Sequence, residues 1–209
     1  KYDGVDQYFT RAYEFGYSFS DEETFQKWGR EEILRDVVRV VRKVRPDVIV
    51  TMPRQSSGGG QHHQAAAQLG HEAFHAAADP NRFPEQIKEG LRPWQVRKSY
   101  EAGGGGGGRG RGGAIPAGGS PGDVPASAKP AGNAVFVQTG TYDPLLGMSW
   151  SQFGALARSA HLCQGMGQLI PRPGPTQAGY VLVNGTPGAT PETDILDGID
   201  FSLTRLTRF

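Results

Sequence analysis

The apolar positions between residues 20 and 45 predict an amphipathic helix. Ser20, with Glu23 three residues later, fits a capping box at the start of a helix. Apolar residues then recur at three- and four-residue spacing, as in a helix packed on a sheet: Ile33, Leu34, Val37, Val40, Val41 and Val44. The charged positions between them, including Arg42, are expected on a solvated face. Arg45-Pro46 ends the pattern.

A second helix is predicted after a short apolar strand at Val48–Thr51. It runs from about Gln64 to Ala78, where Asp79-Pro80 stops it. At about 100° per residue, one face is apolar, and its members are Ala66, Leu69, Gly70, Ala73, Phe74 and Ala77. The opposite side carries polar residues that we expect in water: Gln64, Gln68, His71 and His75.

The second half of the chain has weaker signals. Strands are predicted at residues 96–100, 134–137 and 180–183. Ser149 is expected to cap a helix with one apolar stripe, made of Trp150, Phe153, Leu156, Ala157 and Ala160. His161 follows Ala157 by four residues and is therefore expected to point inward. Residues 81–95 are expected to be irregular, and residues 195–209 weakly helical.

Alternation of helix and strand indicates an α/β fold, Rossmann-like, with a mostly parallel sheet and helices on both faces. Between residues 102 and 133 the chain is nearly all Gly, Ala, Pro and Ser. Such a segment cannot bury enough apolar surface to offset its ordering entropy. It is therefore interpreted as a low-complexity, disordered insert within a single domain spanning residues 1–209.

Composition removes some classes of function. The net charge is +1, so bulk electrostatics favour neither a nucleic acid nor a membrane surface as partner. The single cysteine, Cys163, excludes an internal disulfide. No apolar run approaches the roughly 20 residues of a membrane span.

Candidate chemistry begins with two adjacent histidines. A glycine-rich loop leads from the predicted strand to His62 and His63 at the start of the second helix. In open α/β sheets this places the pair at the carboxyl edge, where ligands usually bind. Neutral imidazole binds zinc and serves as an acid or base near neutral pH. The alternative is that both are ordinary polar residues of a first helical turn.

His71-Glu72-Ala73-Phe74-His75 also matches the His-Glu-x-x-His pattern of zinc peptidases. The predicted helix places both histidines opposite the apolar face. Residue 81, where one protease class has a third histidine ligand, is Asn. Surface histidines are therefore the favoured interpretation, and a zinc peptidase is the weaker one.

Several segments resemble the PIG-L (LmbE-like) deacetylases. They are residues 8–13, 46–50, 59–66, 83–86, 90–94 and 158–167. The resemblance implies a zinc-dependent hydrolase that removes an acetyl group from an N-acetylglucosamine-type sugar conjugate. It places a zinc ligand on His63, and on His161 a role in substrate binding or oxyanion stabilisation. No cofactor-binding residue other than this metal ligand is implied.

Two departures from the family pattern limit that expectation. The resemblance implies an early Ala-His-Pro-Asp-Asp-Glu motif that supplies a His and an Asp to zinc. This motif is absent. The first histidine of the later His-Pro-Asp-His motif falls on Gly60, so His62 would have to substitute as the catalytic histidine. We therefore expect an N-terminally incomplete PIG-L-like domain that is inactive by itself. A non-catalytic binding remnant of the same fold is the alternative.

Overall fold

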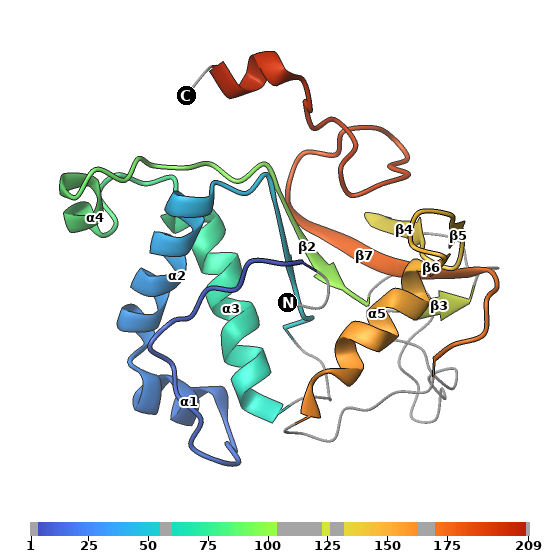
Figure 1. The fold of residues 1–209 in the computed structure, drawn as a ribbon. Helices are drawn as coiled ribbons and strands as arrows, with labels where there is room; N and C mark the ends of the chain where they lie inside the picture. The colour runs from blue at the N-terminus through green and yellow to red at the C-terminus, as the bar shows by residue number, and fades with distance from the viewer. Residues whose placement is uncertain (1–3, 55–59, 104–122, 126–131, 163–169, 208–209) are drawn as a thin grey trace.

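The computed structural model describes residues 4–54, 60–103, 123–125, 132–162 and 170–207 (Figure 1). The helices are α1 (Asp21–Trp28), α2 (Arg30–Val44), α3 (Gly60–Ala76), α4 (Pro84–Lys88), α5 (Trp150–Ser159) and the short 3₁₀ helix η2 (Leu203–Thr207). The strands are β1 (Val48–Thr51), β2 (Lys98–Ala102), β3 (Asp123–Pro125), β4 (Ala134–Gln138), β5 (Tyr142–Asp143), β6 (Met148–Ser149) and β7 (Thr176–Gly185).

The main sheet mixes parallel and antiparallel pairs. Its order is β1-β2-β7-β3, and β4 also pairs with β7. Only β1 and β2 are parallel among these pairs, while β7 runs antiparallel to β2, β3 and β4. The α/β class is confirmed, but the expected mostly parallel sheet is wrong for the described residues. Strand direction depends on which strands become neighbours, and an apolar run does not encode that choice.

Most of the predicted elements form, but the single helix predicted between residues 20 and 45 is divided at Gly29, where φ is 75°, into α1 and α2. The predicted helix–strand–loop–helix order from α2 to α3 is confirmed, and β1 lies in the parallel pair as expected. Ser20 and Ser149 cap α1 and α5 through their side chains, and Ser149 forms a full capping box with Gln152. The segment expected to be irregular contains α4, and the C-terminal tail contains only η2.

The glycine-rich insert is ordered in one described place. Residues 123–125 form β3, with Asp123 opposite Ala178 of β7. The expectation that this segment lacks regular structure is therefore wrong for these residues, because β7 offers them a backbone to pair with. Residues 104–122 and 126–131 lie outside the described residues.

The main core lies between the sheet and the helices α2 and α3, which pack side by side (Figure 1). Its buried residues include Leu34 and Val38 of α2 and Leu69 and Phe74 of α3. A side chain at Gly70 would meet the Thr51 methyl at 2.7 Å, so glycine lets α3 lie close against β1.

No helix among the described residues has the length and apolar character needed to cross a membrane.

The other face of β2 is covered by a loop. Side chains alternate along a strand, so Lys98 and Tyr100 point away from α3. Lys98 Nζ donates to Glu192 Oε1 at 2.9 Å, and the Tyr100 hydroxyl donates to Glu192 Oε2 at 2.8 Å. All three side chains are buried. At this point the sheet therefore carries the 186–199 loop, where helices on both faces were expected.

Arg42 was expected in water but is buried, with 1 % of its surface exposed. Its guanidinium donates six hydrogen bonds of 2.7–3.3 Å, five to backbone carbonyls and one to the Gln86 side chain. The carbonyls belong to Ala76, Ala77, Asp79, Arg82 and Phe83. Arg42 thus satisfies the last carbonyls of α3, where a helix dipole favours a cation.

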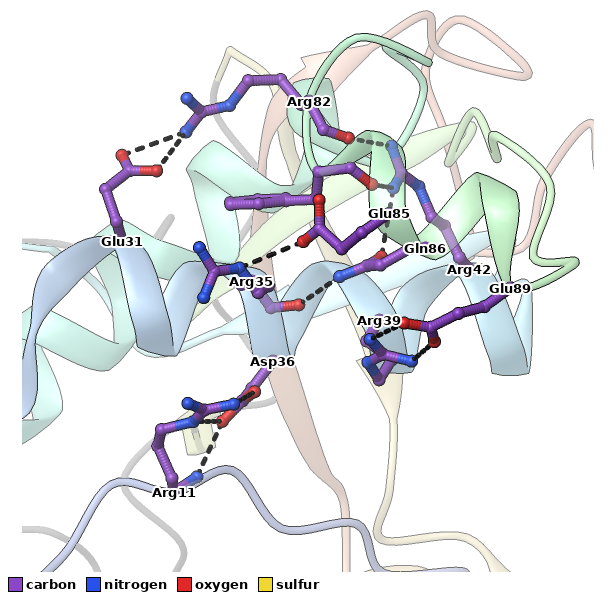
Figure 2. A network of polar contacts seen from close by, with 11 residues as sticks. Arg11, Glu31, Arg35, Asp36, Arg39, Arg42, Arg82, Glu85, Gln86 and Glu89 are labelled. Atoms are coloured by element: carbon purple, nitrogen blue, oxygen red, sulfur yellow. Dashed lines mark hydrogen bonds and ion pairs between the residues drawn. The ribbon is translucent and has the colours of Figure 1, made fainter.

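Around this buried contact, exposed ion pairs link α2 to its neighbours (Figure 2). Arg35 pairs with Glu85 at 3.2 Å, Arg39 pairs with Glu89, and Glu31 accepts from Arg82 at 3.1 Å. Each of these exposed pairs is expected to contribute little, about 0–1 kcal/mol. The fixed position of the 79–89 segment therefore depends on Arg42 more than on the ion pairs.

Replacing Arg42 with Met is expected to lower the free energy of unfolding by about 3 kcal/mol or more, because five backbone carbonyls and the Gln86 side chain each lose a charged donor. Urea unfolding followed by circular dichroism measures the change. Arg39→Met, which removes an exposed pair on the same helix, is the control and should cost about 1 kcal/mol or less. Equal effects of the two substitutions would contradict the assigned role of Arg42.

Candidate functional site

An open hollow of about 710 Å³ lies where β1 and β2 end. It is lined by Asp21, Pro53, Arg54, Gln68 and Glu101. Because β1 and β2 are parallel, their carboxyl ends meet at the same edge of the sheet, which is where ligands bind in open α/β proteins. This set of residues is called the edge pocket below.

Four elements position the edge pocket. Asp21 stands in the first turn of α1, directly after its Ser20 cap. Gln68 projects from the middle of α3, Arg54 follows β1, and Glu101 lies one residue before the end of β2. A capped helix, a packed helix and two paired strands are rigid supports, so the polar groups are held in place before a ligand arrives.

The polar groups of the edge pocket are joined in pairs. Arg54 Nε donates to Glu101 Oε1 at 2.8 Å. Gln68 Nε2 donates to Asp21 Oδ2, and this hydrogen bond lowers the pKa of the Asp21 carboxyl. The pocket thus offers carboxylate acceptors, an amide and a guanidinium in fixed orientations, a set suited to a ligand rich in hydroxyl and amide groups.

His71 lies beside Glu101 and is buried, with 7 % of its surface exposed. His71 Nε2 is 3.1 Å from Glu101 Oε1 and 3.2 Å from Thr51 Oγ1, while its Nδ1 is 3.5 Å from Asn184 Nδ2. The nearby carboxylate favours the tautomer with the proton on Nε2, which faces Glu101 and Thr51, and with Nδ1 as the acceptor on the side of the amide. Burial and the nearby Arg54 charge lower the pKa of His71, against the opposing effect of Glu101.

The expectation that Gln64 and His71 face solvent is therefore wrong, because both are buried, and Ala66 of the predicted apolar face is exposed. Besides its apolar face, α3 has a second buried stripe at helical spacing, formed by Gln64, Ala67 and His71. The helix contacts α1 and α2 as well as β1, so it is covered on more than one side. His75 is exposed, as expected.

The three histidines predicted for the site lie elsewhere. His62 is half-buried, stacks on Trp28 at a centroid distance of 5.2 Å and meets the Phe15 ring edge-on at 4.4 Å. His63 is exposed in the first turn of α3. His161 lies just beyond the end of α5 and is exposed, so its expected inward orientation is wrong. None of the three is among the described residues that line the edge pocket.

The His-Glu-x-x-His pattern gains no support from the geometry. Its histidines lie in different surroundings, one buried and one exposed. Glu72 pairs with Arg30 of α2 at 3.1 Å. Across the described stretches, no three His, Cys, Asp or Glu side chains come together as metal ligands.

Sequence patterns missed the polar residues of the edge pocket. Arg54 follows the strand predicted at Val48–Thr51, and Glu101 directly follows the strand predicted at residues 96–100. A polar residue at the carboxyl end of a parallel strand is the signal that could have drawn attention to both. Asp21 was identified only as a helix start, and Gln68 only as a solvated position.

The fold and the pocket thus define an α/β protein with a polar pocket at the carboxyl edge of a parallel strand pair. No family model matches the chain. Part of it is similar to enzymes named 1D-myo-inositol 2-acetamido-2-deoxy-alpha-D-glucopyranoside deacetylase. One from Frankia casuarinae is 38% identical over 71 residues, which is 34% of this chain and 21% of that enzyme.

Two further relatives carry the same enzyme name. A Frankia alni enzyme is 45% identical over 65 residues, 31% of this chain and 21% of the enzyme. A Thermobispora bispora enzyme is 36% identical over 70 residues, 34% of this chain and 21% of the enzyme. The matched stretch therefore spans about a third of this chain and a fifth of each relative.

The buried, neutral His71 predicts a pH dependence of stability. Its pKa is lower in the folded chain than the value of about 6.5 in the unfolded chain, so the unfolded state binds protons more readily on acidification. The charged groups that face it are Arg54 and Glu101. The stability that neutral His71 contributes is complete above about pH 6.5 and is lost as the pH falls below that value.

Urea unfolding at about pH 7.5 and pH 5 tests this expectation. The loss of stability between the two pH values should be smaller in His71→Asn than in the wild type. His75→Asn, an exposed position one turn along α3, is the matched control and should keep the wild-type loss. An unchanged loss in His71→Asn would contradict the assignment.

Proposed function

We propose that this chain is part of a deacetylase that hydrolyses the acetamido group of an N-acetylglucosamine-type sugar conjugate. The observation that carries the proposal is the 36–45% identity to enzymes named as such deacetylases. The substrate in those names combines a sugar and an inositol, both rich in hydroxyl groups. We assign the edge pocket as the place where this ligand binds.

The chemistry of the edge pocket supports this assignment. Sugar hydroxyls both donate and accept hydrogen bonds, and the pocket presents acceptors on Asp21 and Glu101 and donors on Gln68 and Arg54. The Arg54–Glu101 and Gln68–Asp21 pairs orient these groups in advance. Holding a substrate in a fixed orientation is one of the larger contributions that a binding site makes to hydrolysis.

Zinc dependence is a second part of the proposal and rests on the resemblance to PIG-L deacetylases. A catalytic zinc usually takes three protein ligands. His63 is exposed and could supply one, yet the described residues contain no group of three metal-ligating side chains. These residues therefore do not fit a complete zinc site by themselves, and the roles assigned to them are binding and orientation of the substrate.

The proposed function predicts that the chain binds the acetylated glucosaminyl-inositol named in its relatives. Saturation-transfer NMR or calorimetry with this compound measures the affinity. Arg54→Ala should weaken binding about tenfold, since one charged hydrogen-bonding group is lost. Arg92→Ala, at an exposed position outside the pocket, is the control and should bind as the wild type does.

If the wild type does not bind the conjugate, the proposed function is wrong. Binding combined with acetate release would establish the enzyme. Binding without acetate release is expected of this chain by itself. The non-catalytic binding remnant would be supported if release were still absent after an upstream Ala-His-Pro-Asp-Asp-Glu segment is added. Proton NMR of the reaction mixture measures the acetate directly.

The metal proposal predicts that the chain by itself binds zinc weakly and releases no acetate, because one histidine is too few. Calorimetric titration with zinc chloride tests this, and His63→Ala should weaken the remaining binding. His75→Ala is the matched control on the same helix. Tight zinc binding with peptidase activity that is lost in Glu72→Gln would favour the peptidase interpretation instead.

A further inference from the structure

The Glu101 carboxylate is held from two sides through the same oxygen atom. Oε1 accepts from Arg54 Nε at 2.8 Å and lies 3.1 Å from His71 Nε2. The two donors come from different elements, the segment after β1 and helix α3. Among the described residues, no hydrogen bond reaches the second oxygen, Oε2, although the side chain of Glu101 lines the edge pocket.

His71 is placed to donate from Nε2, which faces both Glu101 and Thr51. Nε2 lies 3.1 Å from Glu101 Oε1 and 3.2 Å from Thr51 Oγ1, and the Asn184 amide lies on the Nδ1 side. The imidazole is buried between β1, β2 and β7, and so cannot reach a ligand in the pocket directly. A buried donor whose partner lines a pocket acts through that partner, as second-layer residues do in other binding sites.

We propose that Glu101 is the ligand-contacting carboxylate of the edge pocket, that its Oε2 accepts a hydroxyl or amide hydrogen of the sugar conjugate, and that His71 is the positioning residue that holds it. This inference rests on the proposed function and names the contact on which binding depends. Sequence patterns assigned no chemistry to Glu101, and they placed His71 only in the disfavoured zinc peptidase motif.

The affinity for acetylated glucosaminyl-inositol tests the contact. Glu101→Gln keeps the shape of the side chain but replaces one acceptor oxygen with a donor, and it should weaken binding about tenfold. Glu72→Gln is the matched control, because Glu72 lies on α3 next to His71 and pairs with Arg30 on α2. It should leave the affinity unchanged.

Two substitutions of His71 separate positioning from simple packing. In His71→Gln the side-chain amide can still donate to Glu101, and the affinity should stay within about twofold of the wild type. His71→Leu fills similar space without a donor and should weaken binding about tenfold. Urea unfolding of both variants shows whether each is folded, and NMR of the wild-type His71 ring should show a shift when the conjugate is added.

The outcomes separate this inference from the proposed function. If the wild type binds and Glu101→Gln binds equally well, the contact is wrong while the proposed function stands. If His71→Gln and His71→Leu are equally weakened, or the His71 ring does not respond to the conjugate, the positioning role is wrong. If the wild type binds no conjugate, the inference and the proposed function both fail.

Discussion

The arrangement of the helices depends on one buried guanidinium. Arg42 stands on α2, yet its acceptors are the last carbonyls of α3 and the turn that leads into α4. The carbonyls of Ala77, Asp79 and Phe83 also accept from a backbone N–H. Arg42 is their second donor and also donates to Ala76 and Arg82, and leaving buried carbonyls without donors would be costly. A planar group with five N–H donors can serve several of them at once, which a lysine could not. The end of α3 is thereby fixed relative to α2.

The position of α3 in turn decides what reaches the carboxyl edge of the sheet. Gly70 allows the helix to lie directly against Thr51 of β1. This close approach brings His71 within hydrogen-bonding distance of Glu101 on β2 and places Gln68 beside Asp21 of α1. The pocket is therefore a consequence of helix packing, since its polar groups come from elements as far apart in sequence as α1 and β2.

The similarity to glucosaminyl-inositol deacetylases and the chemistry of the edge pocket both favour a ligand rich in hydroxyl groups. The relatives are named for a substrate rich in hydroxyl groups, and the pocket holds paired acceptors and donors that suit one. The matched stretch covers a third of this chain and a fifth of those enzymes. Under the proposed function, the described residues would bind and orient the substrate, since they contain no group of three metal-ligating side chains.

The sequence by itself determined the elements that local rules govern. The caps at Ser20 and Ser149, the apolar stripe of α2 and the strand β1 follow from side-chain spacing within a few residues. Tertiary structure alone decided the burial of Arg42 and His71, because their partners lie 20 or more residues away. It also decided the antiparallel pairing of β7. Periodicity reports which face of an element is apolar, but a polar group is buried where distant partners satisfy it.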